Sequence, residues 1–272
     1  MILIDSSRCT GCGLCVSVCF PQRLTLSEGR AVVKEPDCIH CGHCIAVCPQ
    51  NAVSTDLYDM GEVMETGGRS FAPEPEQVIK YIKARRSIRH FKNRPVEEKK
   101  LKLLLEAGRY TPTGGNRQAV SYVVVQGEAL QTLRRMALDS LCEIGRNILS
   151  SSDPQNQPPY AERWIAMQAE KEGGPSNPDS LFFHAPAVIL IIADRTIEPA
   201  LAASYMELTA ISQGLGVLYS GFTTKAVEND PRIKELLGIP GGEQAQVCMV
   251  VGYPDIRFKR TAPRKKAQVR WL

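Results

Sequence analysis

Eight of the ten cysteines fall within forty residues, and their spacing repeats. In each copy two, two and three residues separate four thiols, at Cys9, Cys12, Cys15 and Cys19 and again 29 residues later at Cys38, Cys41, Cys44 and Cys48. Thiolate is the soft ligand that iron in a cubane cluster requires. In runs of this spacing three cysteines bind one [4Fe–4S] cluster and the fourth reaches the neighbouring one. The pattern therefore predicts two [4Fe–4S] clusters and one-electron chemistry.

The crossing of the fourth cysteine assigns the ligands of each cluster. One cluster is expected to take Cys9, Cys12, Cys15 and Cys48, and the other Cys38, Cys41, Cys44 and Cys19. Zinc is the alternative metal, but a zinc site needs neither a third nor a fourth closely spaced cysteine in each half. Residues 1–56 resemble the bacterial dicluster ferredoxins, which implies one-electron carriers of low potential. We expect His40 and His43 to tune the potential rather than bind iron.

A second candidate site begins with three guanidinium groups and a hydroxyl within five residues, at Arg85, Arg86, Ser87 and Arg89. Guanidinium groups pair with phosphate oxygens in bidentate fashion, and a serine hydroxyl adds one short hydrogen bond. Taken alone, the cluster is more typical of a solvated basic turn. A phosphate-binding role is favoured only by the motifs that accompany it.

Those motifs are Pro112–Gln118, Gln213–Gly216, Tyr219–Phe222 and the basic turn Pro263–Lys265. Together with Arg85–Arg89, called the arginine segment below, they occur in the order typical of the nitroreductase family. Residues 76–272 resemble that family. The resemblance implies FMN, a homodimer with the flavin at the subunit interface, and two-electron reduction at flavin N5.

By position, the resemblance also implies which residues bind FMN. The expected cofactor-binding residues are Arg85, Arg86, Ser87, Arg89, Asn116, Ser220, Gly221 and Arg264. The arginines and Ser87 would hold the phosphate and ribityl chain, Asn116 the pyrimidine edge or the ribityl hydroxyls, and the backbone of Ser220 and Gly221 would approach N5. Thr113, Ala119-Val120 and Ser220 depart from the family pattern, so the resemblance does not fix the substrate. No catalytic side chain is identified.

The elements that must position these residues can be read from periodicity. After the cysteine segment, Gly and Pro clusters indicate a linker over residues 57–75. Helical spacing follows over Glu76–Arg85 and Glu97–Arg109, and apolar runs predict strands at Ser121–Gln126, Ala187–Ala193 and Gln246–Gly252. We expect an α+β protein, with a ferredoxin-like two-cluster domain over 1–56 and a three-layer α/β/α domain over 76–272. Residues 150–179 are predicted to be an insertion or lid outside the core.

Composition and charge limit the partners. The net charge is +4, and residues 257–272 hold seven basic and no acidic side chains. No nucleic-acid-binding motif accompanies this tail, so we expect it to supply phosphate ligands rather than to bind nucleic acid. No apolar run approaches the roughly 20 residues that span a bilayer, and the first residues lack a secretory pattern. We expect a cytoplasmic protein, with Cys142 and Cys248 buried as small hydrophobes.

Together the two segments predict an FMN enzyme that receives or passes electrons through its clusters. FMN can accept one or two electrons, so it would connect one-electron carriers with hydride transfer to nitro compounds, quinones, enones or similar acceptors. An external ferredoxin, another low-potential carrier or NAD(P)H could be the donor. The alternative is a non-catalytic module that relays electrons to a partner protein. A cluster-based sensor is a third hypothesis, and it would require salt-sensitive nucleic-acid binding.

Overall fold

The computed structural model describes residues 1–34, 38–66, 72–150, 160–171 and 177–272. The chain divides into two compact units, Met1–Pro73 with Thr113–Arg117, and Glu74–Pro112 with Gln118–Leu272. The predicted linker, 57–75, extends from the end of the first unit into the first two residues of the second, and its residues 67–71 lie outside the described part. In the parts of the chain that the model describes, no helix combines the length and apolar character needed to cross a membrane.

The first unit contains two copies of one arrangement, in which a cysteine motif with a short helix lies between two strands. Strand β1 (Ile2–Ile4) pairs antiparallel with β4 (Val53–Thr55). Strands β2 (Leu24–Ser27) and β3 (Arg30–Val33) form an antiparallel hairpin between the cysteine motifs. The short helices α1 (Leu14–Ser17) and α2 (His43–Val47) each follow a glycine with φ near +75°, Gly13 and Gly42. A left-handed residue at the same place in each motif lets the chain turn sharply around its cysteines.

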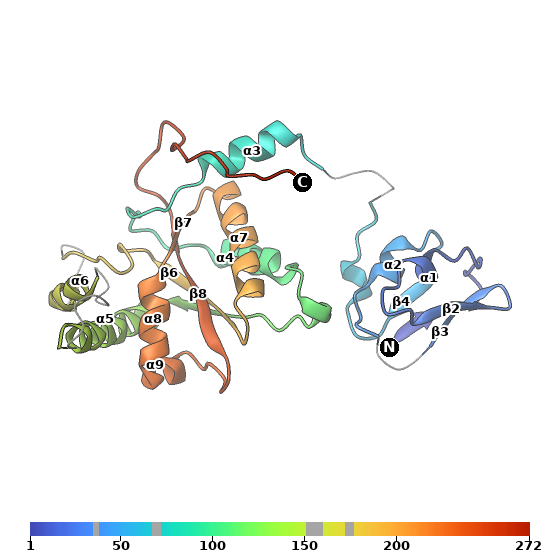
Figure 1. The fold of residues 1–272 in the computed structure, drawn as a ribbon, viewed down its shortest axis with the longest axis horizontal. Coiled ribbons are helices and arrows are strands. Elements are labelled where there is room, and N and C mark those ends of the chain that lie inside the picture. Colours follow the sequence, from blue (N-terminus) through green and yellow to red (C-terminus); the bar gives the residue numbers. More distant parts are fainter. Residues whose placement is uncertain (35–37, 67–71, 151–159, 172–176) are drawn as a thin grey trace. The chain divides into compact units, whose positions relative to one another are not determined.

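The second unit contains one four-stranded sheet and helices on both of its faces (Figure 1). Its elements are α3 (Pro75–Ala84), α4 (Glu98–Arg109), β5 (Ser121–Gln126), α5 (Gly127–Ser150), α6 (Ala161–Ala166), the 3-10 helix η4 (Met167–Glu170), β6 (Ala187–Ala193), α7 (Ile197–Ser212), β7 (Gly216–Tyr219), α8 (Gly221–Asn229), α9 (Pro231–Leu236) and β8 (Gln244–Gly252). The strand order is β5-β6-β8-β7, with every pairing antiparallel.

The middle strand β6 shows why the unit has three layers. All seven of its residues are buried. Val188 and Leu190 pack into a core beneath α5, α6, α8 and α9, whereas Ile189 and Ile191 pack into a second core beneath α4 and α7. Because successive side chains of a strand point to opposite faces, a continuous apolar run covers both cores. The expected α+β class with an α/β/α second domain is confirmed.

The described part of the predicted insertion belongs to the core, so the lid prediction is wrong for residues 160–171. Helix α6 packs along α5, and Trp164 and Met167 are buried in the same core as β6. The aromatic rings of Tyr160 and Trp164 lie 5.4 and 5.5 Å from the ring of Phe222 at the start of α8. The apolar face of Tyr160–Glu170 therefore serves packing. The rest of the predicted insertion, 151–159 and 172–176, lies outside the described residues.

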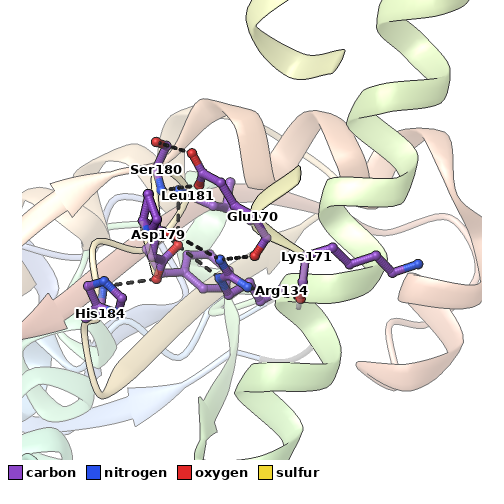
Figure 2. Close-up of polar contacts among 9 residues, drawn as sticks. Arg134, Glu170, Lys171, Asp179, Ser180, Leu181 and His184 are labelled. Atoms are coloured by element: carbon purple, nitrogen blue, oxygen red, sulfur yellow. Dashed lines mark hydrogen bonds and ion pairs between the residues drawn. The ribbon is translucent and has the colours of Figure 1, made fainter. Parts of the chain in front are cut away.

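An ion pair holds this region onto α5 (Figure 2). Arg134 Nε lies 3.0 Å from Asp179 Oδ1, and both side chains are almost fully buried. The guanidinium also donates to the Glu170 carbonyl at 2.7 Å, while the Asp179 carboxylate accepts the backbone amides of Phe182 and His184. A buried ion pair is tolerated only when its remaining hydrogen-bonding positions are filled in this way.

Cys142 and Cys248 are both buried, as predicted. Burial raises the pKa of the Cys248 thiol to about 12. Since the thiolate is the reactive form, we expect Cys248 to resist iodoacetamide at pH 8 in the folded protein and to react in denaturant. Mass spectrometry of the peptide that contains Cys248 checks this. Alkylation in the folded state at the rate of a free thiol would contradict it.

Candidate functional site

Two cavities in the first unit divide the cysteines between them. One cavity is lined by Cys9, Cys12, Cys15 and Cys48. The second is lined by Cys19, Cys38, Cys41 and Cys44. The structure thus groups the thiols as the crossing of the fourth cysteine predicts, three from one motif and one from the other. Their role as iron ligands stays a prediction.

Backbone amides surround the thiols. The sulfurs of Cys9, Cys19 and Cys48 accept N–H groups from Ala31, Arg23 and Ala52 at 3.2–3.4 Å. Such donors stabilise negative charge on sulfur, and the amides of Ala31 and Gly11 lower the pKa of Cys9. Burial has the opposite effect at Cys44, where it raises the thiol pKa to about 11. A bound metal centre would offset this rise in pKa, because coordination deprotonates the thiol.

The number of thiols at each cavity fits a four-iron cluster. Each of the two cavities is lined by four cysteines. A four-iron cluster has this requirement, because each of its irons takes a separate cysteine.

In the second unit, the arginine segment runs beside β7. Ser87 forms a parallel bridge with Val217, and the Ile88 amide donates to the Val217 carbonyl at 3.0 Å. Strand β7 ends at Tyr219, which leads directly into Ser220 and α8. The structure therefore places the predicted phosphate ligands on the segment that adjoins the strand carrying Ser220 and Gly221.

Ser220 and Gly221 differ in what they offer. The Ser220 amide donates to the Cys248 carbonyl at 2.9 Å, and its buried hydroxyl lies 2.8 Å from Thr223 Oγ1 as the cap of α8. The Ser220 amide is thus engaged within the protein, and its predicted approach to flavin N5 stays a prediction. Gly221 opens α8, where a backbone N–H has no partner within the helix. A Cβ at Gly221 would meet nothing within 4 Å, so space for a ligand exists beside it.

Arg86 of the arginine segment contacts the basic tail. The Arg86 guanidinium donates to the Arg260 carbonyl at 3.1 Å and lies 5.9 Å from the Phe258 ring centre. Arg264, four residues further on, is exposed and donates to the carbonyl of Pro263. Arg89 is exposed as well. Several guanidinium groups therefore face solvent on or near one segment, as a phosphate site requires.

Comparison with known proteins agrees with these features. Residues 82–253, more than half of the chain, match the model of the nitroreductase family. The chain belongs to the nitroreductase family. Residues 1–60 match the model of a 4Fe-4S dicluster domain, so this nitroreductase carries that domain at its N-terminal end.

The chain is also similar to individual proteins of known sequence or structure. An NADPH-dependent oxidoreductase of Staphylococcus aureus is 27% identical over 183 residues, which are 66% of this chain and 65% of that protein, less than two thirds of its length. A nitroreductase with bound FMN from Bacteroides fragilis has a TM-score of 0.51 at 20% identity, over 71% of this chain and 98% of that one. An FMN-dependent nitroreductase from Clostridium difficile has a TM-score of 0.53 at 21% identity, over 72% and 100%. At such identities the structural likeness concerns the fold alone.

Asn116 lies in the first unit of this nitroreductase, within the 3-10 helix η2 (Gly114–Asn116). Its side-chain amide donates to the carbonyls of Ile39 and His40, at 3.1 and 2.9 Å. These carbonyls lie between two of the predicted cluster ligands, Cys38 and Cys41. The predicted contact of Asn116 with the flavin stays a prediction, and the structure assigns its amide hydrogens to this loop.

Sequence reasoning missed Glu207 of α7. The carboxylate is buried, with Oε1 at 3.1 Å from Arg85 Nη1 and Oε2 at 3.2 Å from the Tyr219 hydroxyl. Burial and the charge of Glu207 raise the pKa of Tyr219. A signal was present in the sequence, since Glu207 is the single charged residue between Glu198 and Lys225. A charge in an otherwise apolar helix indicates a specific buried partner.

Proposed function

We propose that this nitroreductase is an FMN-dependent oxidoreductase that exchanges electrons through two [4Fe–4S] clusters and reduces an electron-poor organic acceptor. The observation that carries the proposal is the presence, in one chain, of two four-cysteine cavities and a nitroreductase fold whose arginine segment pairs with β7, the strand that precedes Gly221. Nitro compounds, quinones and enones are the proposed acceptors. When bound, FMN supplies the conversion between single-electron supply and hydride transfer.

The residues of the chain would bind and orient that cofactor. Arg85, Arg86, Ser87 and Arg89 would hold the phosphate through charge-assisted hydrogen bonds. The amide of Gly221 and the open space beside it would accommodate the flavin ring. The residues therefore fit FMN at both ends, with a cationic segment for the phosphate and an uncovered backbone donor for the ring.

The electron donor and the assembly are also proposed. The name of the Staphylococcus aureus relatives supports NADPH as a donor, and the cluster domain supports a ferredoxin or another low-potential carrier. A homodimer is supported by apolar side chains that the chain leaves uncovered on two helices that touch each other. Ile79 and Ile82 of α3 and Tyr205 of α7 are each at least 40% exposed, and Tyr81 of α3 donates to the Leu208 carbonyl of α7.

An anaerobic acceptor screen tests the function. Protein reduced with dithionite, freed of excess reductant, is mixed with nitroaromatics, quinones and enones, and reoxidation is followed by visible absorption. Turnover with at least one small-molecule class is expected. Reoxidation by partner proteins alone would overturn the reductase proposal in favour of an electron relay.

The FMN site is tested by replacing Arg85 and Ser87 with alanine. Each lost charge-assisted hydrogen bond weakens binding by about 1.5 kcal/mol or more, so FMN affinity should fall at least about 100-fold. Iron content should stay unchanged, because these residues lie in the second unit. Arg195→Ala, which removes an exposed guanidinium elsewhere in the same unit, is the matched control. Unchanged FMN affinity in the double variant would contradict the assignment.

A further inference from the structure

A buried carboxylate joins the two ends of the proposed flavin site. Glu207 lies on α7, Arg85 caps the C-terminal end of α3, and Tyr219 ends β7. One oxygen of Glu207 accepts from Arg85 Nη1 at 3.1 Å, and the other accepts from the Tyr219 hydroxyl at 3.2 Å. The same hydroxyl lies 3.0 Å from the Ala203 carbonyl one turn earlier in α7. Three separate elements are thereby fixed to each other around one side chain.

The side chains of Glu207 and Arg85 differ in their exposure to solvent. The Glu207 side chain is 7% exposed, whereas that of Arg85 is 30% exposed. A carboxylate buried to this degree requires a charged or hydrogen-bonded partner. Arg85 donates one of its five N–H groups to Glu207. Because the guanidinium group is planar and rigid, this hydrogen bond also fixes the direction of the other N–H groups, which can bind a second anion from the solvent side.

We propose that Glu207 is a positioning residue, which holds Arg85 toward the FMN phosphate. The inference rests on the proposed function, because it presumes that Arg85 meets a phosphate. Without Glu207, the long Arg85 side chain would regain rotamer freedom, and this freedom would have to be lost again when FMN binds. Glu207 therefore determines how well the protein distinguishes a phosphorylated flavin from an unphosphorylated one.

A purely electrostatic role makes the opposite prediction. A negative charge near the phosphate site repels phosphate, so its removal would strengthen FMN binding if charge alone mattered. Positioning and charge can be separated with two conservative variants. Glu207→Gln keeps an acceptor oxygen in place without the charge, and Glu207→Asp keeps the charge but withdraws it by one methylene.

The experiment measures affinities of the flavin-free full chain for FMN and for riboflavin by fluorescence quenching. Positioning predicts that Glu207→Ala and Glu207→Asp weaken FMN binding about tenfold while riboflavin affinity changes less than twofold. Glu207→Gln should stay within about threefold of the wild type. In the Arg85→Ala background, Glu207→Ala should cause no further loss. Glu235→Ala, an exposed glutamate on α9, is the matched control.

Several outcomes would overturn the inference. They are stronger FMN binding in Glu207→Ala and Glu207→Gln, wild-type behaviour of Glu207→Asp, or equal losses for FMN and riboflavin. Far-UV circular dichroism and the thermal midpoint verify folding, and the Gln and Asp variants decide the question if the alanine variant does not fold. Absence of FMN binding by the wild type would instead refute the proposed function, so the two failures are distinguishable.

Discussion

Replacing Cys19 by serine is expected to remove the cluster of the other motif, with iron falling from about eight to about four per chain. Cys19 belongs to the first cysteine motif in sequence, but it lines the cavity of Cys38, Cys41 and Cys44. A serine hydroxyl is a harder and far less acidic ligand than a thiol, so the cubane loses its fourth attachment. Iron and acid-labile sulfide analysis of anaerobically reconstituted protein measures the loss.

Double variants decide between crossed and uncrossed pairing. Cys19→Ser with Cys38→Ser removes two ligands of one cavity, so about four irons should remain. Cys19→Ser with Cys9→Ser affects both cavities and should leave almost none. Pairing within each motif would exchange these two results. Cys142→Ser is the control, because Cys142 is buried in α5 and lines neither cavity.

Replacing Arg134 by methionine is expected to reduce the free energy of unfolding by about 3–5 kcal/mol. The change leaves the Asp179 carboxylate buried at 6% exposure without its cation (Figure 2). It also frees the Glu170 carbonyl, which accepts from Arg134 at 2.7 Å. Urea unfolding followed by circular dichroism measures the loss. Arg134→Met with Asp179→Asn should recover part of it, because no unpaired charge remains.

The effect of this pair depends on pH in a defined direction. Burial opposes ionisation of Asp179, but the amides of Phe182 and His184 and the Arg134 guanidinium outweigh it and lower the pKa of the carboxyl. A lowered pKa contributes stability above the unfolded-state value of about 3.9. That contribution disappears as pH falls through the lower folded-state value. The difference between wild type and Arg134→Met should therefore narrow below about pH 4, and a difference that widens there would contradict this assignment.

Local patterns predicted the elements of this protein well. The strands Ser121–Gln126 and Ala187–Ala193 were predicted with the observed bounds, since continuous β-branched runs have no competing helical period. Gln246–Gly252 was predicted two residues short of β8, because polar Gln244 interrupts the apolar run. The short strand β7 and helix α8 were read only as family motifs. Four residues are too few for periodicity to be recognised.

Long-range features could not be predicted in the same way. The strand order and the antiparallel pairing depend on connections that span whole helices. The partners of Arg134 and Glu207 could not be predicted, because each partner lies far away in sequence, even though the lone charge of Glu207 in an apolar helix was itself visible. The cysteines are the exception. Their grouping across motifs followed from spacing alone, since the geometry of a cubane permits few arrangements.

The repeated build of the first unit has a consequence for the energy of an electron held there. If the two cluster sites were identical, as the shared turns at Gly13 and Gly42 make them locally, the two clusters would have equal reduction potentials. The bias must come from positions where the copies differ. One such position is Leu14, which lines the first cavity, whereas its counterpart His43 lines the second. Because polar groups near a cluster stabilise its reduced form, we expect His43 to contribute to a difference in reduction potential between the two clusters.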